Sequence, residues 1–199
     1  MTSFTYEPEN QSPLETYEWD STWISHTEKE EARRILYIGD SISCALRTVL
    51  TPMSGESILF DGFGTSKAVD NPLFLPMLSL WMQEERHRDL ILFNNGLHGF
   101  HLEDTEAYAA AYEATVRAIL AEAPATPLVL VLSTYTPTAH ERVLRRNEAV
   151  CKIAERLSLP VLDLYTPSYE HRALLSEDEV HFTPAGYEVL AREILSYLG

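Results

Sequence analysis

The chain has 199 residues, 45% of them hydrophobic, and its 15 Lys and Arg against 30 Asp and Glu give a net charge of −15. A chain of this size fits a single domain that buries a sizeable core. The acidic balance argues against nucleic acid as a partner, because affinity for a phosphate backbone comes largely from Lys and Arg. The two cysteines, Cys44 and Cys151, cannot supply a disulfide framework and have no metal-ligand neighbours at zinc spacing.

The N-terminal segment is polar and acidic, and it lacks the basic patch and apolar run of a secretory signal. No stretch approaches the ~18 consecutive apolar residues that a membrane span needs. We therefore expect a cytoplasmic protein with no membrane partner. Residues 1–30 are predicted to be an irregular arm, and residues 31–199 a single domain. The arm carries Tyr17, Trp19 and Trp23, so we expect its second half to pack on the body or on a neighbouring subunit of a homo-oligomer.

From Arg34 onward, short apolar runs alternate with longer segments of helical period, which is the pattern of successive βα units. The runs are continuous rather than alternating in polarity, as in strands buried on both faces of a parallel sheet. The predicted strands are 35–38, 57–60, 90–93, 128–132 and 161–164, and the predicted helices are 42–50, 71–85, 105–121, 138–157 and 184–198. This order predicts a three-layer α/β/α sandwich with a five-stranded parallel sheet. Ligands bind at the carboxyl ends of such strands, so chemistry is expected just after each run.

The first predicted strand is followed by Gly39-Asp40-Ser41, which leads straight into a helix. A small residue before a serine permits a sharp turn and exposes the hydroxyl at the helix N-terminus. The helix dipole there favours developing negative charge. The triplet therefore favours Ser41 as a nucleophile, and the alternative is that Ser41 only caps the helix.

The second and third predicted strands are also followed by unusual loops. Residues 61–66, a predicted loop with the two glycines Gly62 and Gly64, follow the second strand. Glycine here, Gly64 in particular, could present a backbone N–H to an oxyanion or could merely permit a turn with positive φ. Two amides and two histidines, Asn94, Asn95, His98 and His101, crowd the end of the third. They could cap the loop or bind a substrate, and a histidine pair with this spacing could also bind a metal.

The segment before the last predicted helix contains Asp178 and, three residues later, His181. Within one tight loop a carboxylate at this spacing can turn back onto Nδ1 of the histidine, which leaves Nε2 free to act as a base. This loop can lie beside the loop after the first strand, so the pair can reach Ser41.

Together these pieces resemble the SGNH hydrolases, also called the GDSL esterase and lipase superfamily. The resemblance implies a flavodoxin-like fold and a Ser-His-Asp catalytic triad. It departs from the family at Ile42, where the name of the family has Leu, and at the third block, where His98 stands in place of Asn. The matching blocks, in chain order, are Gly39-Asp40-Ser41, Gly64, Gly96-Leu97-His98 and Asp178-x-x-His181.

By this resemblance, Ser41 attacks an ester carbonyl, His181 carries the proton to the leaving alcohol, and Asp178 orients His181. The backbone N–H groups of Ser41 and Gly64 would hold the oxyanion. A side chain from the third block, either His98 or Asn94, would complete the oxyanion hole. The chemistry requires no cofactor and no metal.

Asp40 and Asn95, which adjoin these residues, and Tyr135, which follows the fourth predicted strand, are predicted to bind the substrate. The substrate is expected to be a small-molecule ester. A small acyl group, acetyl above all, on a carbohydrate or a similar polar alcohol is the form we favour. The superfamily acts on many esters, so fold and triad do not by themselves name the substrate.

Two other classes of function stay open. A non-catalytic binding module on the same fold is favoured if His98 blocks the oxyanion hole instead of completing it. A metal-dependent hydrolase would use His98, His101 and a carboxylate. A dinucleotide-binding domain is excluded, because the turn after the first strand lacks the glycine-rich fingerprint and no P-loop is present.

Overall fold

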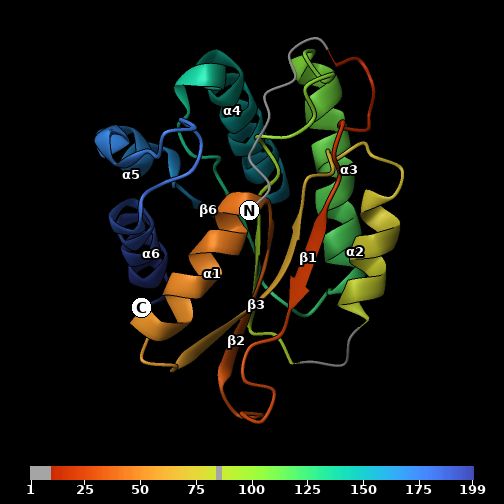
Figure 1. Ribbon diagram of the computed structural model, residues 1–199. Helices are drawn as coiled ribbons and strands as arrows, with labels where there is room; N and C mark the ends of the chain where they lie inside the picture. Colours follow the sequence, from red (N-terminus) through yellow and green to blue (C-terminus); the bar gives the residue numbers. More distant parts are fainter. Residues whose placement is uncertain (1–9, 84–86) are drawn as a thin grey trace.

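The computed structural model describes residues 10–83 and 87–199, which form one sheet between two layers of helices (Figure 1). Within these residues, the sheet has six strands in the order β1-β3-β2-β4-β5-β6. The strands are β1 (Asp20–Trp23), β2 (Arg33–Gly39), β3 (Ile58–Thr65), β4 (Leu90–Phe93), β5 (Leu128–Val131) and β6 (Val161–Leu162). The helices are α1 (Ser41–Met53), α2 (Phe74–Met82), α3 (Thr105–Glu122), α4 (His140–Leu157), α5 (Tyr165–Glu170) and α6 (Pro184–Leu198), with 3-10 turns η1 (Pro137–Ala139) and η2 (Arg172–Leu174). The predicted three-layer α/β/α fold is confirmed.

Both faces of the sheet are buried, which explains why its strands read as continuous apolar runs. Successive side chains of a strand point to opposite faces. Along β2, Ile35 and Tyr37 pack with α1 and α6, whereas Leu36 and Ile38 pack with α2 and α3. All four side chains are at most 2% exposed. The sheet is therefore a rigid frame that fixes where the loops at its carboxyl edge begin.

The sequence predicted five strands, and the sixth is β1, which comes from the N-terminal arm. β1 runs antiparallel to β3 and pairs Asp20 with Thr65 and Trp23 with Gly62. The other strands pair in parallel, so the sheet is mixed rather than purely parallel. Sequence analysis missed β1 because this edge segment is half polar and contains no apolar run.

The loop that the sequence predicted at residues 61–66 is largely strand, because β3 continues to Thr65. Its two glycines serve close packing rather than a turn, and neither has a positive φ. A Cβ on Gly62 would lie 1.8 Å from Cζ2 of Trp23, and a Cβ on Gly64 would lie 2.2 Å from Cys44 Sγ. The missing side chains let β1 and α1 approach the strand.

The remaining helices follow the prediction with shifted ends. The closing helix 184–198 is confirmed, and Thr183 caps it by accepting a hydrogen bond from Gly186 N. Helix α2 is shorter than the predicted 71–85, of which residues 84 and 85 lie outside the described part. The sequence did not predict α5 and η2, which carry the chain from β6 towards α6. In the described part of the chain, no helix is both long and apolar enough to cross a membrane.

Candidate active site

Ser41 lies at the carboxyl end of β2, where the strand turns directly into α1. The residue that caps α1 is Asp40, whose Oδ1 accepts a hydrogen bond from Ile42 N at 2.9 Å. The capping role that was the alternative for Ser41 therefore belongs to its neighbour. The turn requires Gly39, since a Cβ there would lie 2.8 Å from the Ser43 side chain. Ser41 thus begins the helix with a hydroxyl that takes no part in capping.

The loop before α6, residues 176–183, brings Asp178 and His181 into line with Ser41. His181 Nδ1 lies 2.7 Å from Asp178 Oδ2, and His181 Nε2 lies 2.7 Å from Ser41 Oγ. Because His181 Nδ1–H donates a hydrogen bond to the carboxylate, Nε2 is left to accept a hydrogen bond from the serine hydroxyl. Ser41 and His181 are 140 positions apart in the chain, and the fold joins them at the carboxyl edge of the sheet.

Asp178 is fixed by hydrogen bonds made within its own loop. Its Oδ1 accepts from the backbone N–H groups of Val180 and His181 at 3.0 and 2.9 Å, and from Ser176 Oγ at 2.7 Å. Desolvation raises the pKa of Asp178, but the hydrogen bonds from His181, Val180 and Ser176 outweigh it and hold the pKa below the usual range. The carboxylate therefore stays ionised at neutral and mildly acidic pH, as a group that orients an imidazole must.

The two amides after β4 tie their loop to neighbouring segments. Asn94 Nδ2 donates to Val131 O at 2.7 Å and to Ser133 Oγ at 3.0 Å, so its two amide hydrogens are directed at the β5 side of the sheet. Asn95 Nδ2 donates to Lys67 O at 2.7 Å. Both asparagines are buried. Their positions fit a supporting role at this edge more directly than contact with a substrate.

The two histidines of the same loop pair with separate carboxylates. His98 Nδ1 lies 2.9 Å from Glu15 Oε1 of the N-terminal arm, and His101 Nε2 lies 2.7 Å from Asp70 Oδ2. Among the described residues, no group of three or more His, Cys, Asp or Glu side chains is placed to hold a metal ion. The cluster that a metal-dependent hydrolase would need is therefore not found in that part of the chain.

Two buried arginines of α4 hold the backbone of the loop after β4, and sequence analysis did not predict a functional role for either of them. Arg146 donates to four carbonyl oxygens of this loop at 2.6–3.1 Å, and Arg142 donates to Leu97 O at 3.3 Å. Burial lowers the pKa of Arg146 to about 10, so the guanidinium is still charged at neutral pH. The only signal in the sequence is that both arginines share the apolar face of α4. The four acceptors of Arg146 are Gly96, His98, Gly99 and Leu102.

Gly64 lies inside the sheet and not in the loop where the sequence placed it. Ser66 N donates to Trp19 O at 3.1 Å, and hydrogen-bonded pairs recur at every second residue of an antiparallel ladder. Gly64 lies two residues before Ser66 in the chain and pairs with Ser21 of β1. The backbone N–H of Gly64 therefore points towards β1, as that of Ser66 does. The geometry does not support the oxyanion role predicted for Gly64.

Asp40 and Tyr135, two of the predicted substrate-binding residues, have different surroundings. Asp40 is 2% exposed and lines a small cavity together with Thr134 and other residues. Tyr135 is partly exposed, and its backbone N–H donates to Ser168 Oγ at 2.8 Å. Of these two side chains, only that of Tyr135 is open to a ligand from solvent.

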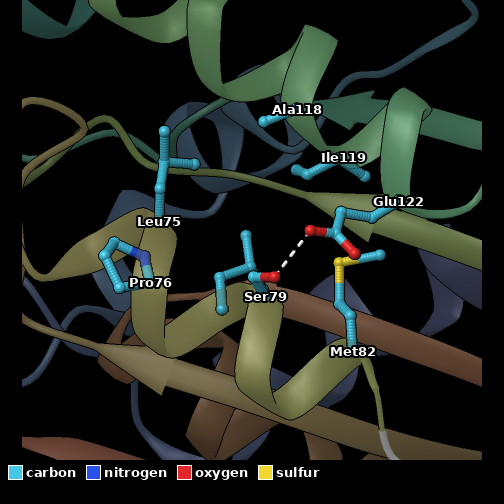
Figure 2. A pocket seen from close by; sticks show the side chains of 8 residues that line it. Leu75, Pro76, Ser79, Met82, Ala118, Ile119 and Glu122 are labelled. Carbon is cyan, nitrogen blue, oxygen red and sulfur yellow. Dashed lines mark hydrogen bonds between the residues drawn. The ribbon is translucent and has the colours of Figure 1, made fainter.

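An apolar hollow of about 270 Å³ lies between α2 and α3 (Figure 2). Leu75, Met82 and Ile119 are among its walls, and Ser79 Oγ donates to Glu122 Oε1 at 2.6 Å within it. No residue of the predicted site lines it, and α2 and α3 cover the face of the sheet opposite α1 and α6. The hollow is separate from the surroundings of Ser41.

The three-layer fold, with a serine, a histidine and a carboxylate in hydrogen-bond contact at its carboxyl edge, is that of an SGNH hydrolase. The family described as the GDSL-like lipase/acylhydrolase family matches residues 72–189, more than half of the chain. The chain belongs to this family, and the protein is a carboxylic-ester hydrolase. The matched range includes the loop after β4 and the loop with Asp178 and His181, and it begins after Ser41.

Solved structures share the fold at low sequence identity. A member of the lipolytic G-D-S-L family from Veillonella parvula DSM 2008 has a TM-score of 0.68 and 19% identity, covering 83% of this chain and 97% of that chain. An acetyl xylan esterase has a TM-score of 0.65 at 15% identity, with 83% and 100% covered. A carbohydrate esterase family 3 protein from Talaromyces cellulolyticus has a TM-score of 0.65 at 16% identity, with 83% and 96% covered. At these identities the likeness concerns the fold alone. No curated protein matches the chain.

Proposed function

We propose that the protein is a serine esterase that removes small acyl groups, acetyl above all, from a carbohydrate or a similar polar alcohol. The observation that carries the proposal is the unbroken hydrogen-bond chain from Ser41 through His181 to Asp178, with both links at 2.7 Å. This arrangement lets an oriented base take the proton of the serine as its oxygen attacks.

In the proposed reaction, Ser41 Oγ attacks the carbonyl carbon of the ester while its proton passes to His181 Nε2. Asp178 accepts a hydrogen bond from Nδ1–H of His181 and stabilises the imidazolium that forms. The tetrahedral intermediate collapses, His181 gives the proton to the leaving alcohol, and an acyl-enzyme remains on Ser41. Water then attacks the acyl group with His181 as base, which releases the acid and restores the serine hydroxyl. These steps use protons and oxygen nucleophiles alone and call for no cofactor.

For the oxyanion, we propose the backbone N–H of Ser41 and the side chain of His98. The N–H groups in the first turn of a helix have no carbonyl partner within the helix, and the helix dipole favours an anion there. His98 is preferred to Asn94 because Asn94 directs its amide hydrogens at Val131 and Ser133. Glu15, whose Oε1 lies 2.9 Å from His98 Nδ1, holds the imidazole of His98 in place.

The choice of a small acyl group on a sugar rests on what the similar structures are described as doing. Two of them carry the descriptions acetyl xylan esterase and carbohydrate esterase. The net charge of −15 adds an independent argument, because it disfavours anionic alcohols such as phospholipid headgroups.

The proposal is tested by measuring hydrolysis of p-nitrophenyl acetate and p-nitrophenyl octanoate by the wild type and by Ser41→Ala. We expect activity on the acetate and a burst of p-nitrophenol from acyl-enzyme formation. Ser41→Ala should lower kcat by about 10⁴-fold or more. Ser43→Ala, two positions along the same helix, is the matched control and should keep its activity within a few-fold. Equal turnover by the wild type and Ser41→Ala would exclude the serine mechanism.

A further inference from the structure

Four aromatic rings from three segments of the chain meet at the carboxyl edge of β5 and β6. Tyr135 follows β5, His140 begins α4, and Tyr165 and Tyr169 lie on α5. All four side chains are partly or largely exposed, and Tyr169 is 42% exposed. Exposed aromatic rings that gather in one place are a common feature of binding surfaces.

The cluster contains a flat surface. His140 Nε2 lies 2.7 Å from the Tyr165 hydroxyl, and the two rings are within 5° of parallel with centroids 6.2 Å apart. Since both bonded atoms lie in their own ring planes, the planes cannot be further apart than 2.7 Å, which is less than the ~3.5 Å between stacked rings. The rings therefore lie nearly edge to edge. The hydrogen bond between them fixes this arrangement.

The other two tyrosines complete the cluster. Tyr169 is within 11° of parallel to both His140 and Tyr165, at centroid distances of 6.2 and 6.1 Å. Tyr135 stands at 75° to His140 and at 78° to Tyr169, with both centroids 5.1 Å away. The Arg172 guanidinium lies 4.8 Å from the ring centre of Tyr169. The result is a cluster of partly exposed aromatic rings that also carries phenol hydroxyls, an imidazole and a guanidinium.

This cluster adjoins the proposed catalytic residues. Thr134 and Leu164 line the same small cavity as Asp40 and Ile42, the residues on either side of Ser41. Tyr135 and Tyr165 follow Thr134 and Leu164 directly in the chain. On the other side, η2 leads from α5 to Leu175, which pairs with Phe182 next to His181. The segments that carry the aromatic rings are thus contiguous with those that carry the nucleophile and the base.

We propose that this cluster binds the alcohol part of the substrate and that the alcohol is a neutral pyranose sugar. This inference rests on the proposed esterase function and adds a binding site to it. A pyranose has an apolar face of C–H groups and a rim of hydroxyls, which matches a cluster of exposed rings that carries phenol hydroxyls and lies beside a guanidinium. A fatty alcohol would need an enclosed apolar channel, and a phosphorylated alcohol is disfavoured by the charge of −15.

The test compares kcat/KM for peracetylated xylobiose, glycerol triacetate and p-nitrophenyl acetate in the wild type, Tyr169→Ala and Tyr169→Phe. We expect Tyr169→Ala to lower kcat/KM for the sugar ester by about fivefold to tenfold, because an aromatic contact is lost. Glycerol triacetate should change less than twofold. Tyr169→Phe keeps the ring and should keep the sugar activity. Tyr197→Ala is the control, since Tyr197 is equally exposed at 42% near the end of α6.

Several outcomes would overturn the inference. Equal losses on the sugar ester and glycerol triacetate, or no loss on either, would mean that the cluster does not bind the alcohol. A selective loss on p-nitrophenyl acetate would assign the surface to aromatic alcohols instead of sugars. In these cases the wild type still hydrolyses esters, and the proposed serine-esterase reaction stands. A wild type that hydrolyses none of the three esters would remove the proposed function together with the inference.

Discussion

Two loops that carry predicted site residues, the loop before α6 and the loop after β4, reach their geometry by opposite routes. The loop before α6, residues 176–183, holds its carboxylate by hydrogen bonds from side-chain and backbone groups of the same loop. The loop after β4, residues 94–102, is held largely by remote residues, with Arg146 of α4 on its carbonyls and Glu15 of the N-terminal arm against its histidine.

This difference shows which part of an active site a sequence can encode by spacing alone. An Asp and a His three positions apart need only a tight turn to meet, so the spacing itself carries the geometry. The spacing within the loop after β4 does not encode its geometry in this way, because Arg146 and Glu15, which hold its carbonyls and its histidine, lie more than 40 residues away in the chain. Changes in the first loop should therefore act on chemistry, and changes to the remote arginine that holds the second loop should act first on stability.

The largest effect on the reaction rate is expected from Asp178→Asn, in the loop before α6. The amide keeps the shape of the carboxylate but removes its charge and favours the wrong tautomer of His181, so kcat/KM for p-nitrophenyl acetate should fall by about 10³ to 10⁴-fold. Circular dichroism should show an unchanged fold. Glu177→Gln, an exposed acidic neighbour in the chain, is the control. Wild-type activity in Asp178→Asn would exclude Asp178 as the residue that orients the base.

The same variant has a second readout in the pH dependence of stability. The pKa of Asp178 is lowered in the folded state, so its ionised form stabilises the fold above the ordinary pKa of about 3.9. That contribution is lost as the pH falls through the folded-state pKa. The difference in free energy of unfolding between wild type and Asp178→Asn should therefore be constant from pH 7 to 5 and shrink below pH 4. Urea unfolding at each pH measures it.

A smaller effect on the reaction rate is expected from His98→Ala, in the loop after β4. Removing one oxyanion donor typically costs ~100 to 1,000-fold in kcat, and His98→Asn should recover part of the loss because an amide can also donate. Glu15→Gln is the companion variant, since it removes the charged partner while keeping the imidazole. Activity of His98→Ala within a few-fold of wild type would transfer the oxyanion role to another donor.

Arg146→Met should have the smallest effect on the reaction rate and a large effect on stability. The buried side chain of Arg146 donates hydrogen bonds to four carbonyls. Loss of these hydrogen bonds should lower the free energy of unfolding by about 3–5 kcal/mol. Arg145→Met, at the adjacent exposed position, should change it by less than about 0.5 kcal/mol. Equal stability of the two variants would show that the loop does not depend on Arg146. Urea unfolding of both variants decides the comparison.

Sequence reasoning succeeded where structure is encoded locally. The strand runs such as 35–38 were visible because both faces of the sheet are buried, and helix 184–198 was visible from its cap and its apolar period. It failed where a distant segment changes the role of a residue. Gly62 and Gly64 have the composition of a turn, and the sequence could not show that β1 would pair with them and extend the strand.

The sequence by itself determined the three-layer sandwich, through its apolar runs and helical periods, and it carries the motifs around Ser41, Asp178 and His181 that resemble those of the family to which the chain belongs. Only the tertiary structure decided that Ser41 and His181 Nε2 lie 2.7 Å apart, that Asp40 caps the helix, and that Arg146 holds the loop after β4. It also gathered Tyr135, His140, Tyr165 and Tyr169 onto one surface. Contacts of this kind join segments that are far apart in the chain, and their geometry exists only once the sheet has aligned the ends of its strands.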